Sequence, residues 1–229
     1  MIHPEHHRRA YLKAMGIDVW VPRDAVDPAV DPAIAADAVA ESAEDLDIDG
    51  LRSAVAACTR CELAKTRTQT VFGIGNAKAD WMIIGEAPGA EEDRRGEPFV
   101  GRAGAMLDEM LRSIGLNRQN VFIANILKCR PPNNRDPKPT EAAACRAYLE
   151  RQIELVQPRI ILAVGKIAAQ NLLGCSDPVG QMRARPHELN GIPLVVTYHP
   201  AYLLRSPGDK RKVWSDLCLA VKLAAETAA

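Results

Sequence analysis

Short apolar runs that alternate with helical patterns constrain the fold of this chain more than any other feature. The apolar runs, each suited to a buried strand, cover residues 81–84, 121–127, 160–164 and 193–197. Helices are expected at residues 103–114, 140–156, 166–173 and 209–225. Strands that alternate with helices form parallel sheets with helices on both faces. The sequence therefore predicts a three-layer α/β/α domain with a central, mainly parallel four-stranded sheet.

The first 50 residues differ in composition from the rest of the chain. Residues 24–50 contain nine acidic and no basic side chains, which is typical of a linker. Residues 9–20 have the spacing of a short helix with an apolar face. We therefore expect residues 1–50 to be a tail helix and an acidic Ala/Pro linker, and residues 51–229 to form the folded domain. The tail helix either docks on that domain or binds a protein partner through Trp20.

The formal net charge of zero conceals an asymmetry between the two ends of the chain. Residues 1–57 carry five Lys/Arg and eleven Asp/Glu, whereas residues 58–229 carry 24 Lys/Arg and 18 Asp/Glu. The basic body leaves a polyanionic partner open. No apolar run approaches the roughly 18 residues of a membrane span, and the N-terminus lacks the apolar core of a secretory signal. We expect a cytoplasmic monomer without a membrane partner.

Four of the six cysteines have spacings that suggest a metal centre. The four are Cys58 and Cys61 in a C-x-x-C pair, then Cys129, then Cys145 sixteen residues later. Four thiolates hold either Zn²⁺ or a [4Fe–4S] cluster, and the spacing alone leaves both open. A redox-active C-x-x-C motif is less favoured, because the strand expected before such a motif is missing. Cys175 and Cys218 are expected to be ordinary buried cysteines.

Polar and glycine-rich segments follow the predicted strands. Residues 85–89 (Gly-Glu-Ala-Pro-Gly) follow the first strand, Asn125 interrupts the second, and His199 follows the fourth. Ligands of parallel sheets bind outside the carboxyl ends of the strands. Phe99 lies in a Gly-rich loop, where its ring could stack on a base. From the residues alone, the loop could equally be solvated surface, and Asn125 and His199 could be structural.

These motifs together resemble a known family. Residues 85–89, the Gly-Glu-Pro-Phe-Val-Gly loop at 96–101, Asn125, Lys-Cys-Arg-Pro-Pro at 128–132 and His-Pro-Ala-Tyr-Leu-Leu at 199–204 occur in this order with the four cysteines. The combination closely resembles the family 4 uracil-DNA glycosylases, the iron–sulfur members of their superfamily. The resemblance spans roughly residues 51–225 and favours the cluster over zinc.

The resemblance implies a DNA repair enzyme that flips uracil out of DNA and hydrolyses its N-glycosidic bond, leaving an abasic site. The implied metal ligands are Cys58, Cys61, Cys129 and Cys145. The implied base-binding residues are Gly85, Ala87, Phe99, Asn125 and His199. The implied catalytic residues are His199, Glu86 and Glu92. The implied DNA contacts are Lys128, Arg130 and Arg205 at phosphates and Leu203 as a wedge in the duplex. From its position alone, Leu203 could equally be a core residue at the start of a helix.

Each implied pocket residue has a distinct expected role. Phe99 would stack on uracil, and the Asn125 amide would read N3–H and O4, a pattern that cytosine reverses. His199 would stabilise the negative charge on uracil O2 as a neutral donor. Ala87 stands where family 1 enzymes have an aspartate, so the group that orients the water is either Glu86 or Glu92. Glu92 could instead crowd the C5 position and exclude thymine.

Two other functions remain open from the sequence. A metal-stabilised nucleic-acid-binding module would keep the cysteines and basic residues, but it would have no need for Phe99, Asn125 and His199 together. A glycosylase that also accepts other deaminated bases, such as hypoxanthine, would keep the cysteines, the basic residues and the three pocket residues. A related branch that traps its product covalently carries an inserted Arg/His-rich loop. Its activity is not expected, because no histidine lies between Cys129 and Cys145.

Overall fold

The computed structural model describes residues 45–227, and the predicted tail helix at residues 9–20 lies outside them. The helices are α3 (Ile48–Ala57), α4 (Ala90–Arg95), α5 (Arg102–Ser113), α6 (Pro139–Val156), α7 (Lys166–Leu173), α8 (Val179–Met182), α9 (Pro200–Arg205) and α10 (Lys210–Glu226). The strands are β1 (Ile74–Gly75), β2 (Trp81–Gly85), β3 (Val121–Asn125), β4 (Ile160–Val164), β5 (Pro186–Leu189) and β6 (Ile192–Thr197). Short 3₁₀ turns lie at Glu62–Lys65, Pro132–Asn134 and Pro207–Asp209. Because α3 begins at Ile48, the last residues of the expected linker are helical.

The sheet has six strands in the order β1-β3-β2-β4-β6-β5. The four predicted strands are present, and β3, β2, β4 and β6 pair in parallel. The prediction of four strands was too low, because β1 and β5 add one antiparallel strand at each edge. The α/β class with a mainly parallel sheet is confirmed.

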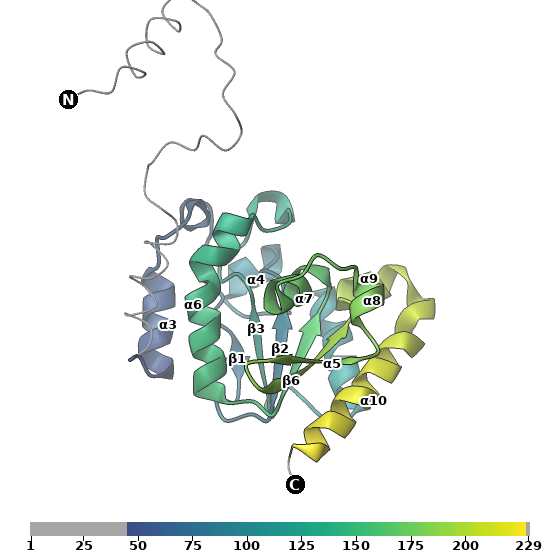
Figure 1. Ribbon diagram of the computed structural model, residues 1–229. Coiled ribbons are helices and arrows are strands. Elements are labelled where there is room, and N and C mark those ends of the chain that lie inside the picture. Colours follow the sequence, from purple (N-terminus) through teal and green to yellow (C-terminus); the bar gives the residue numbers. More distant parts are fainter. Residues whose placement is uncertain (1–44, 228–229) are drawn as a thin grey trace, which may run out of the picture. The chain divides into compact units, whose positions relative to one another are not determined.

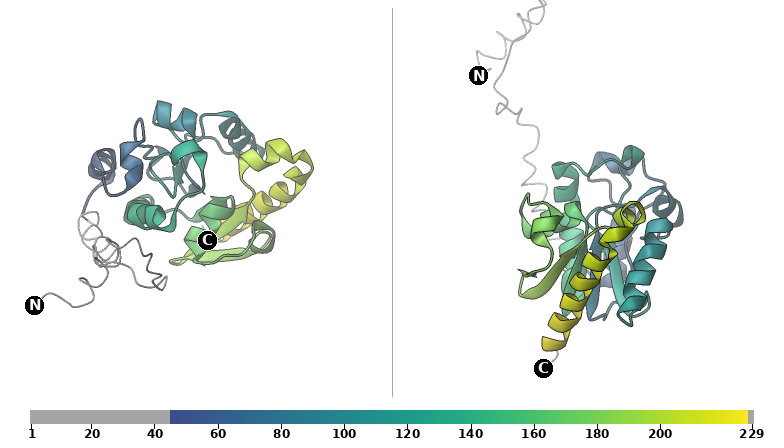
Figure 2. Two further views of the ribbon diagram at one scale, coloured as in Figure 1. Left: turned by 90° about the horizontal axis from the view of Figure 1, so that it is seen from above. Right: turned by 90° about the vertical axis from the view of Figure 1, so that its right-hand side faces the viewer.

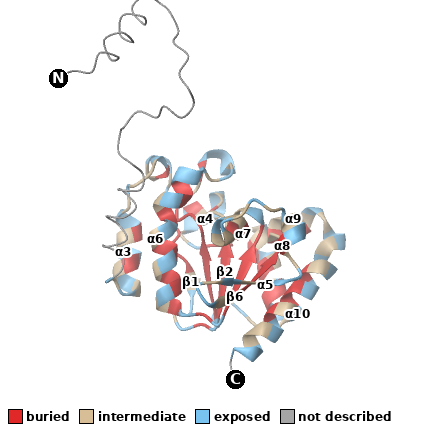
Figure 3. Cartoon of the chain, viewed as in Figure 1, coloured by how far each residue is buried: buried red, intermediate tan, exposed pale blue. Residues whose placement is uncertain are grey.

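Each strand of the centre alternates its side chains between two apolar layers, and the strands are buried throughout (Figure 3). One layer contains Met82 and Ile84 with residues from α3, α6 and α7. The other contains Trp81 and Ile83 with residues from α5, α9 and α10. The three-layer architecture follows, with α6 and α10 on opposite faces of the sheet (Figures 1 and 2).

The ends of two elements depend on local chemistry. Pro139 is the first residue of α6, and the Glu141 carboxylate accepts a hydrogen bond from the Lys138 amide at 2.8 Å. The helix therefore begins one residue before Thr140, the first residue of the helix that the sequence predicts. The β5–β6 hairpin turns through Asn190 and Gly191, both with positive φ, as a two-residue turn requires.

Among residues 45–227, no helix combines the length and the apolar character needed to cross a membrane.

Candidate functional site

The carboxyl ends of the parallel strands gather the predicted pocket residues at one edge of the sheet. Gly85 at the end of β2 pairs with Asn125 at the end of β3. On the other side of β2, the last residue of β4 pairs with Thr197 at the end of β6, and His199 follows it. Glycine, amide and imidazole from three separate motifs thus reach the same edge, as ligand sites in parallel sheets do.

Gly85 is required by its neighbours rather than by its backbone angles. A Cβ at this position would lie 2.5 Å from Asn125 Oδ1 and 2.6 Å from Phe99 Cζ. The amide of Asn125 and the ring of Phe99 therefore both approach the Gly85 backbone closely. This close approach brings together three residues that the sequence analysis assigned to the base pocket.

The Asn125 side chain is buried but has no hydrogen-bond partner among the described residues. Asn125 is 3% exposed. Its amide atoms are nevertheless not among the fully enclosed polar atoms that lack a partner, so they still reach an opening. A buried amide without a protein partner is available to a ligand.

Phe99 is held in an unusual backbone conformation at this opening. Its φ is +55°, a region that L-residues seldom adopt. Arg118 fixes the turn, because its guanidinium donates to the carbonyl of Pro98 at 3.0 Å and to that of Phe99. Gly104 permits the turn, since a Cβ there would lie 1.6 Å from the Phe99 carbonyl oxygen. Neither Arg118 nor its role was predicted, because no local pattern links residue 118 to residue 99.

His199 faces Phe99 and has a defined hydrogen-bonding state. The two rings are stacked with centroids 5.7 Å apart. His199 caps α9, and its Nδ1 accepts from the Ala201 amide at 3.1 Å, so the proton of the neutral ring is assigned to Nε2. Burial lowers the pKa of His199 to about 4, with a further lowering by Arg205 that Glu92 opposes. The ring is therefore a neutral N–H donor at neutral pH.

Glu86 begins the turn after β2 and is partly buried. Its carbonyl accepts from the Leu127 amide at 3.0 Å, which ties the turn to the exit of β3. Burial raises the pKa of its carboxyl group to about 7, and the nearby Asp136 raises it further in the same direction. Glu86 is thus a carboxyl group that changes its charge near neutral pH at the mouth of this site.

The two carboxylate oxygens of Glu92 accept hydrogen bonds from two different segments of the chain. One oxygen accepts from the Gly89 amide at 3.1 Å. The other accepts from the amides of Val100 and Gly101 at 3.0 and 3.3 Å. These bonds connect the start of α4 to the loop that carries Phe99, so Glu92 has a clear structural role beside any catalytic one.

The four cysteines predicted as metal ligands line one small pocket between α3, the segment after β3, and α6. The pocket is lined by Cys58, Cys61, Cys129 and Cys145 together with Arg60, Arg67, Lys128 and Tyr148. Within residues 45–227, no three His, Cys, Asp or Glu side chains are grouped closely enough to hold a metal ion. Cys175 is only partly buried and Cys218 is exposed, so the expectation that both are buried was wrong.

The cationic groups around these thiols indicate an anionic occupant. Arg67 donates to Cys129 Sγ at 3.1 Å, and Arg60 Nε lies 3.5 Å from Cys58 Sγ. A second nitrogen of Arg60, Nη2, is fully buried and has no hydrogen-bond partner in the structure. A buried, positively charged hydrogen-bond donor needs an acceptor. Four thiolates around an iron–sulfur cluster carry net negative charge, so this donor set fits such a group.

Two predicted DNA contacts are corrected by the structure. Lys128 is 1% exposed, and its Nζ donates to the Asn125 carbonyl and to Gln152 Oε1, so it cannot reach a phosphate. Leu203 is also 1% exposed and packs in the layer formed with α5 and α10. A wedge must project from the surface, and the next residue, Leu204, is the more accessible leucine of α9.

The other two predicted DNA contacts are accessible. Arg205 is exposed at the end of α9, and Arg130 is partly exposed, with its Nε 2.8 Å from Asn134 Oδ1. Lys210 and Arg211, at the start of α10, are also exposed. These side chains meet the minimum condition for neutralising phosphates.

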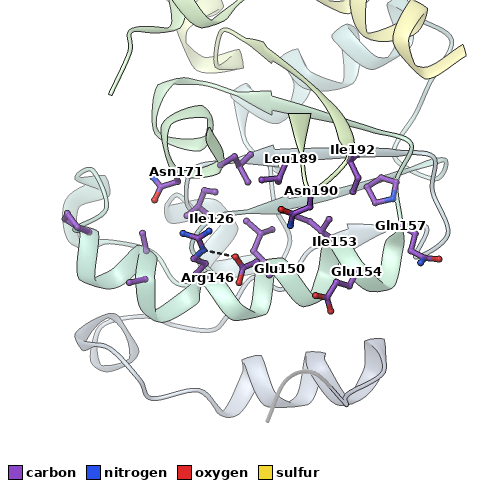
Figure 4. A pocket seen from close by; sticks show the side chains of 16 residues that line it. Ile126, Arg146, Glu150, Ile153, Glu154, Gln157, Asn171, Leu189, Asn190 and Ile192 are labelled. Atoms are coloured by element: carbon purple, nitrogen blue, oxygen red, sulfur yellow. Dashed lines mark hydrogen bonds and ion pairs between the residues drawn. The ribbon is translucent and has the colours of Figure 1, made fainter. Parts of the chain in front are cut away.

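A larger cavity of about 650 Å³ lies away from these residues. It is lined by α6, α7 and the β5–β6 hairpin, and the Arg146–Glu150 ion pair of α6 faces it (Figure 4). None of the residues that the sequence analysis assigned to a site lines this cavity. Its size therefore does not identify it as the site of the chemistry.

Comparisons of this chain with a family model and with known proteins point to the same family. Residues 72–218 match the family model of the uracil DNA glycosylase superfamily. The chain is 42% identical to a type-4 uracil-DNA glycosylase of Archaeoglobus fulgidus over 177 residues, which cover 74% of this chain and 89% of the relative. It is 46% identical to a type-4 uracil-DNA glycosylase of Thermotoga maritima over 164 residues, covering 70% and 85%. A type-5 uracil-DNA glycosylase of Thermus thermophilus is 34% identical over 118 residues, covering 45% and 53%. With its parallel sheet, strand-end pocket and four cysteines, this chain belongs to the type-4 group of the uracil-DNA glycosylase superfamily.

Proposed function

We propose that this protein removes uracil from DNA by hydrolysing the N-glycosidic bond and leaving an abasic site. The observation that carries the proposal is the convergence of Gly85, Phe99, Asn125 and His199 at one edge of the sheet, where the Asn125 amide has no hydrogen-bond partner among the described residues and the imidazole is neutral. The relatives with type-4 names support the same reaction. A binding module without catalysis would not require this set.

Recognition of the base rests on Phe99 and Asn125. The Phe99 ring stacks on a flipped base, and the Asn125 amide accepts from N3–H and donates to O4 of uracil. Cytosine presents the opposite pattern at these positions, so its binding would leave buried groups unpaired. The close approach of Asn125 to the Gly85 backbone limits movement of the side chain as a whole.

Bond cleavage rests on His199 and Glu86. Negative charge grows on uracil O2 as the bond to the sugar breaks, and His199 donates to that oxygen from Nε2. No proton has to move onto His199 beforehand, since the ring already carries a donor when neutral. Glu86 orients the attacking water, because both oxygens of Glu92 are engaged by backbone amides.

The four cysteines hold a [4Fe–4S] cluster in this proposal. Arg60 and Arg67 balance its negative charge, which accounts for the buried Arg60 nitrogen that lacks a partner. When bound, the cluster supplies a cross-link between the segment after α3, the segment after β3, and α6. Arg130 and Arg205 contact the DNA backbone, so binding weakens as the salt concentration rises.

The direct test is incubation of the cluster-loaded protein with an oligonucleotide that contains one uracil, followed by alkali. We expect cleavage at the uracil and none in matched oligonucleotides with thymine or cytosine at that place. An intact strand after treatment with protein of full iron content would overturn the proposal. Cleavage of a hypoxanthine substrate at a similar rate would instead establish a broader base preference.

The dependence of the rate on pH tests the role of Glu86. Its carboxyl group has a pKa of about 7, so the carboxylate form is lost as the pH falls below 7. His199, with a pKa of about 4, stays neutral over the same range. We expect the single-turnover rate to fall about tenfold for each pH unit below about 6, as it does for one required carboxylate.

The matched variants are Glu86→Gln and Glu91→Gln, since Glu91 is an exposed carboxylate in the adjacent α4. Glu86→Gln should excise uracil slowly, and its rate should no longer fall at acid pH (the acid limb of the pH profile). Glu91→Gln should keep the wild-type dependence of the rate on pH. An acid limb that persists in Glu86→Gln would assign it to another group.

A further inference from the structure

The side chain of Lys128 is fully buried and has no carboxylate partner in the described part of the chain. Its Nζ donates to the backbone carbonyl of Asn125 at 2.8 Å and to Gln152 Oε1 at 2.5 Å. Gln152 is itself completely buried, and its amide nitrogen donates to the Phe72 carbonyl at 2.8 Å. Burying an ammonium group is costly unless charge and hydrogen bonds compensate for it. Burial of the Lys128 amino group with two ordered acceptors is therefore not explained by solubility or by packing alone.

The position of this ammonium group supplies that reason. Lys128 lines the same pocket as the four cysteines. Its other contact is the carbonyl of Asn125, whose side chain lies against Gly85 at the base-binding edge. One residue thus links the thiol pocket to the residue that reads the base.

We infer that Lys128 is a positioning residue that couples the cysteine centre to base recognition by Asn125. The inference rests on the proposed function, because it takes the Asn125 amide as the group that reads uracil. The negative centre at the cysteines compensates for the buried ammonium group. The ammonium group in turn fixes the carbonyl at the end of β3.

Fixing that carbonyl fixes the amide that reads the base. The carbonyl carbon and the side chain of Asn125 are both bonded to one Cα, so a shift of the backbone at this residue displaces the side chain as well. Even a small shift alters the contacts of the amide, because Oδ1 already approaches the Gly85 backbone closely. Misplacement of a binding group by about 1 Å is enough to lower a rate by about 100-fold.

The test compares Lys128→Met with Lys138→Met in the full chain. Lys138 is an exposed lysine on the same connection between β3 and α6, so its loss removes one charge without removing a buried bond. Four properties are measured: iron content, affinity for free uracil, affinity for DNA that already contains an abasic site, and the single-turnover rate on uracil-containing DNA.

We expect Lys128→Met to weaken free-uracil binding and to slow excision, each by about 10- to 100-fold. Its affinity for abasic DNA and the salt dependence of that affinity should match those of the wild type. Lys138→Met should bind uracil normally. A general structural defect would weaken both kinds of binding, and a lost phosphate contact would reduce the slope of log affinity against log salt by about 0.9.

Lys128→Met that binds uracil within about twofold of the wild type would overturn the inference. If this variant does not retain iron, Gln152→Met replaces it in the test. That substitution keeps the charge of Lys128 and removes one of its two acceptors, so a smaller loss of uracil affinity is expected, and an unchanged affinity would overturn the inference. A wild-type protein that binds DNA but neither binds nor releases uracil would refute the proposed function instead.

Discussion

His199→Ala is expected to slow uracil excision by about 10²- to 10³-fold at saturating protein, with little change in DNA affinity. The expected loss is the usual effect of removing one donor aimed at a developing oxyanion. The structure supports the assignment because the Nδ1 atom is engaged by the Ala201 amide, which leaves the Nε2 proton for the substrate. Single-turnover kinetics on a uracil oligonucleotide measure the loss directly.

His187→Ala is the matched control for this variant. His187 lies on the edge strand β5, and its Nε2 atom is 2.6 Å from the Met182 carbonyl, so it also loses an imidazole hydrogen bond. Its rate should stay near that of the wild type. A His199→Ala rate within about threefold of the control would remove His199 from the oxyanion role, since one lost donor costs far more.

The pH profile of the Glu86→Gln variant adds an independent check on His199. Burial lowers the pKa of this ring to about 4, so no loss of rate from its protonation is expected near the ordinary histidine value of 6.5. In Glu86→Gln, where the acid limb of Glu86 is absent, the rate should be flat from pH 8 down to about 5. A residual limb near 6.5 in that variant would mean that His199 titrates as an exposed histidine does.

Cys145→Ala is expected to abolish iron binding and to destabilise the fold strongly. Loss of a metal centre is among the few single changes that cost about 4 kcal/mol or more. For a chain of this size, such a cost lowers Tm by roughly 8–16 °C. Cys145 is 3% exposed within α6, and its loss would detach that helix from the segments that carry Cys58 and Cys129.

The control for this change is Cys175→Ala. Cys175 is a partly buried thiol outside the four-cysteine pocket, and its Sγ lies 3.5 Å from the sulfur of Met182. This variant should keep the iron and lose no more than about 3 °C in Tm, as expected for about 1 kcal/mol. Equal Tm values for the two variants would show that Cys145 is an ordinary core residue. A colourless wild-type protein with one zinc per chain would overturn the cluster while leaving the ligands in place.

The sequence predicted the central elements because their signals are local. The run Ile160–Val164 is buried on both faces, so a continuous apolar stretch was sufficient to place β4 with its observed bounds. The helix α7 has the bounds that the sequence predicted, and Gly174 follows it in the left-handed conformation. The edge strands gave weaker signals: β1 has only two residues, and β5 begins with a proline. The Asn190-Gly191 pair would have predicted the β5–β6 hairpin.

The sequence by itself indicated the family through the resemblance of its motifs. It also determined the α/β class and placed the motifs at the carboxyl ends of the strands, because these follow from residue order and periodicity. Only the tertiary structure decided which side chains are accessible. Lys128 and Leu203 looked like surface contacts in the sequence, yet both are buried, since burial depends on what packs against a residue from distant parts of the chain. Arg118, Gln152 and Arg67 became visible for the same reason, because each contacts a residue brought near by the fold.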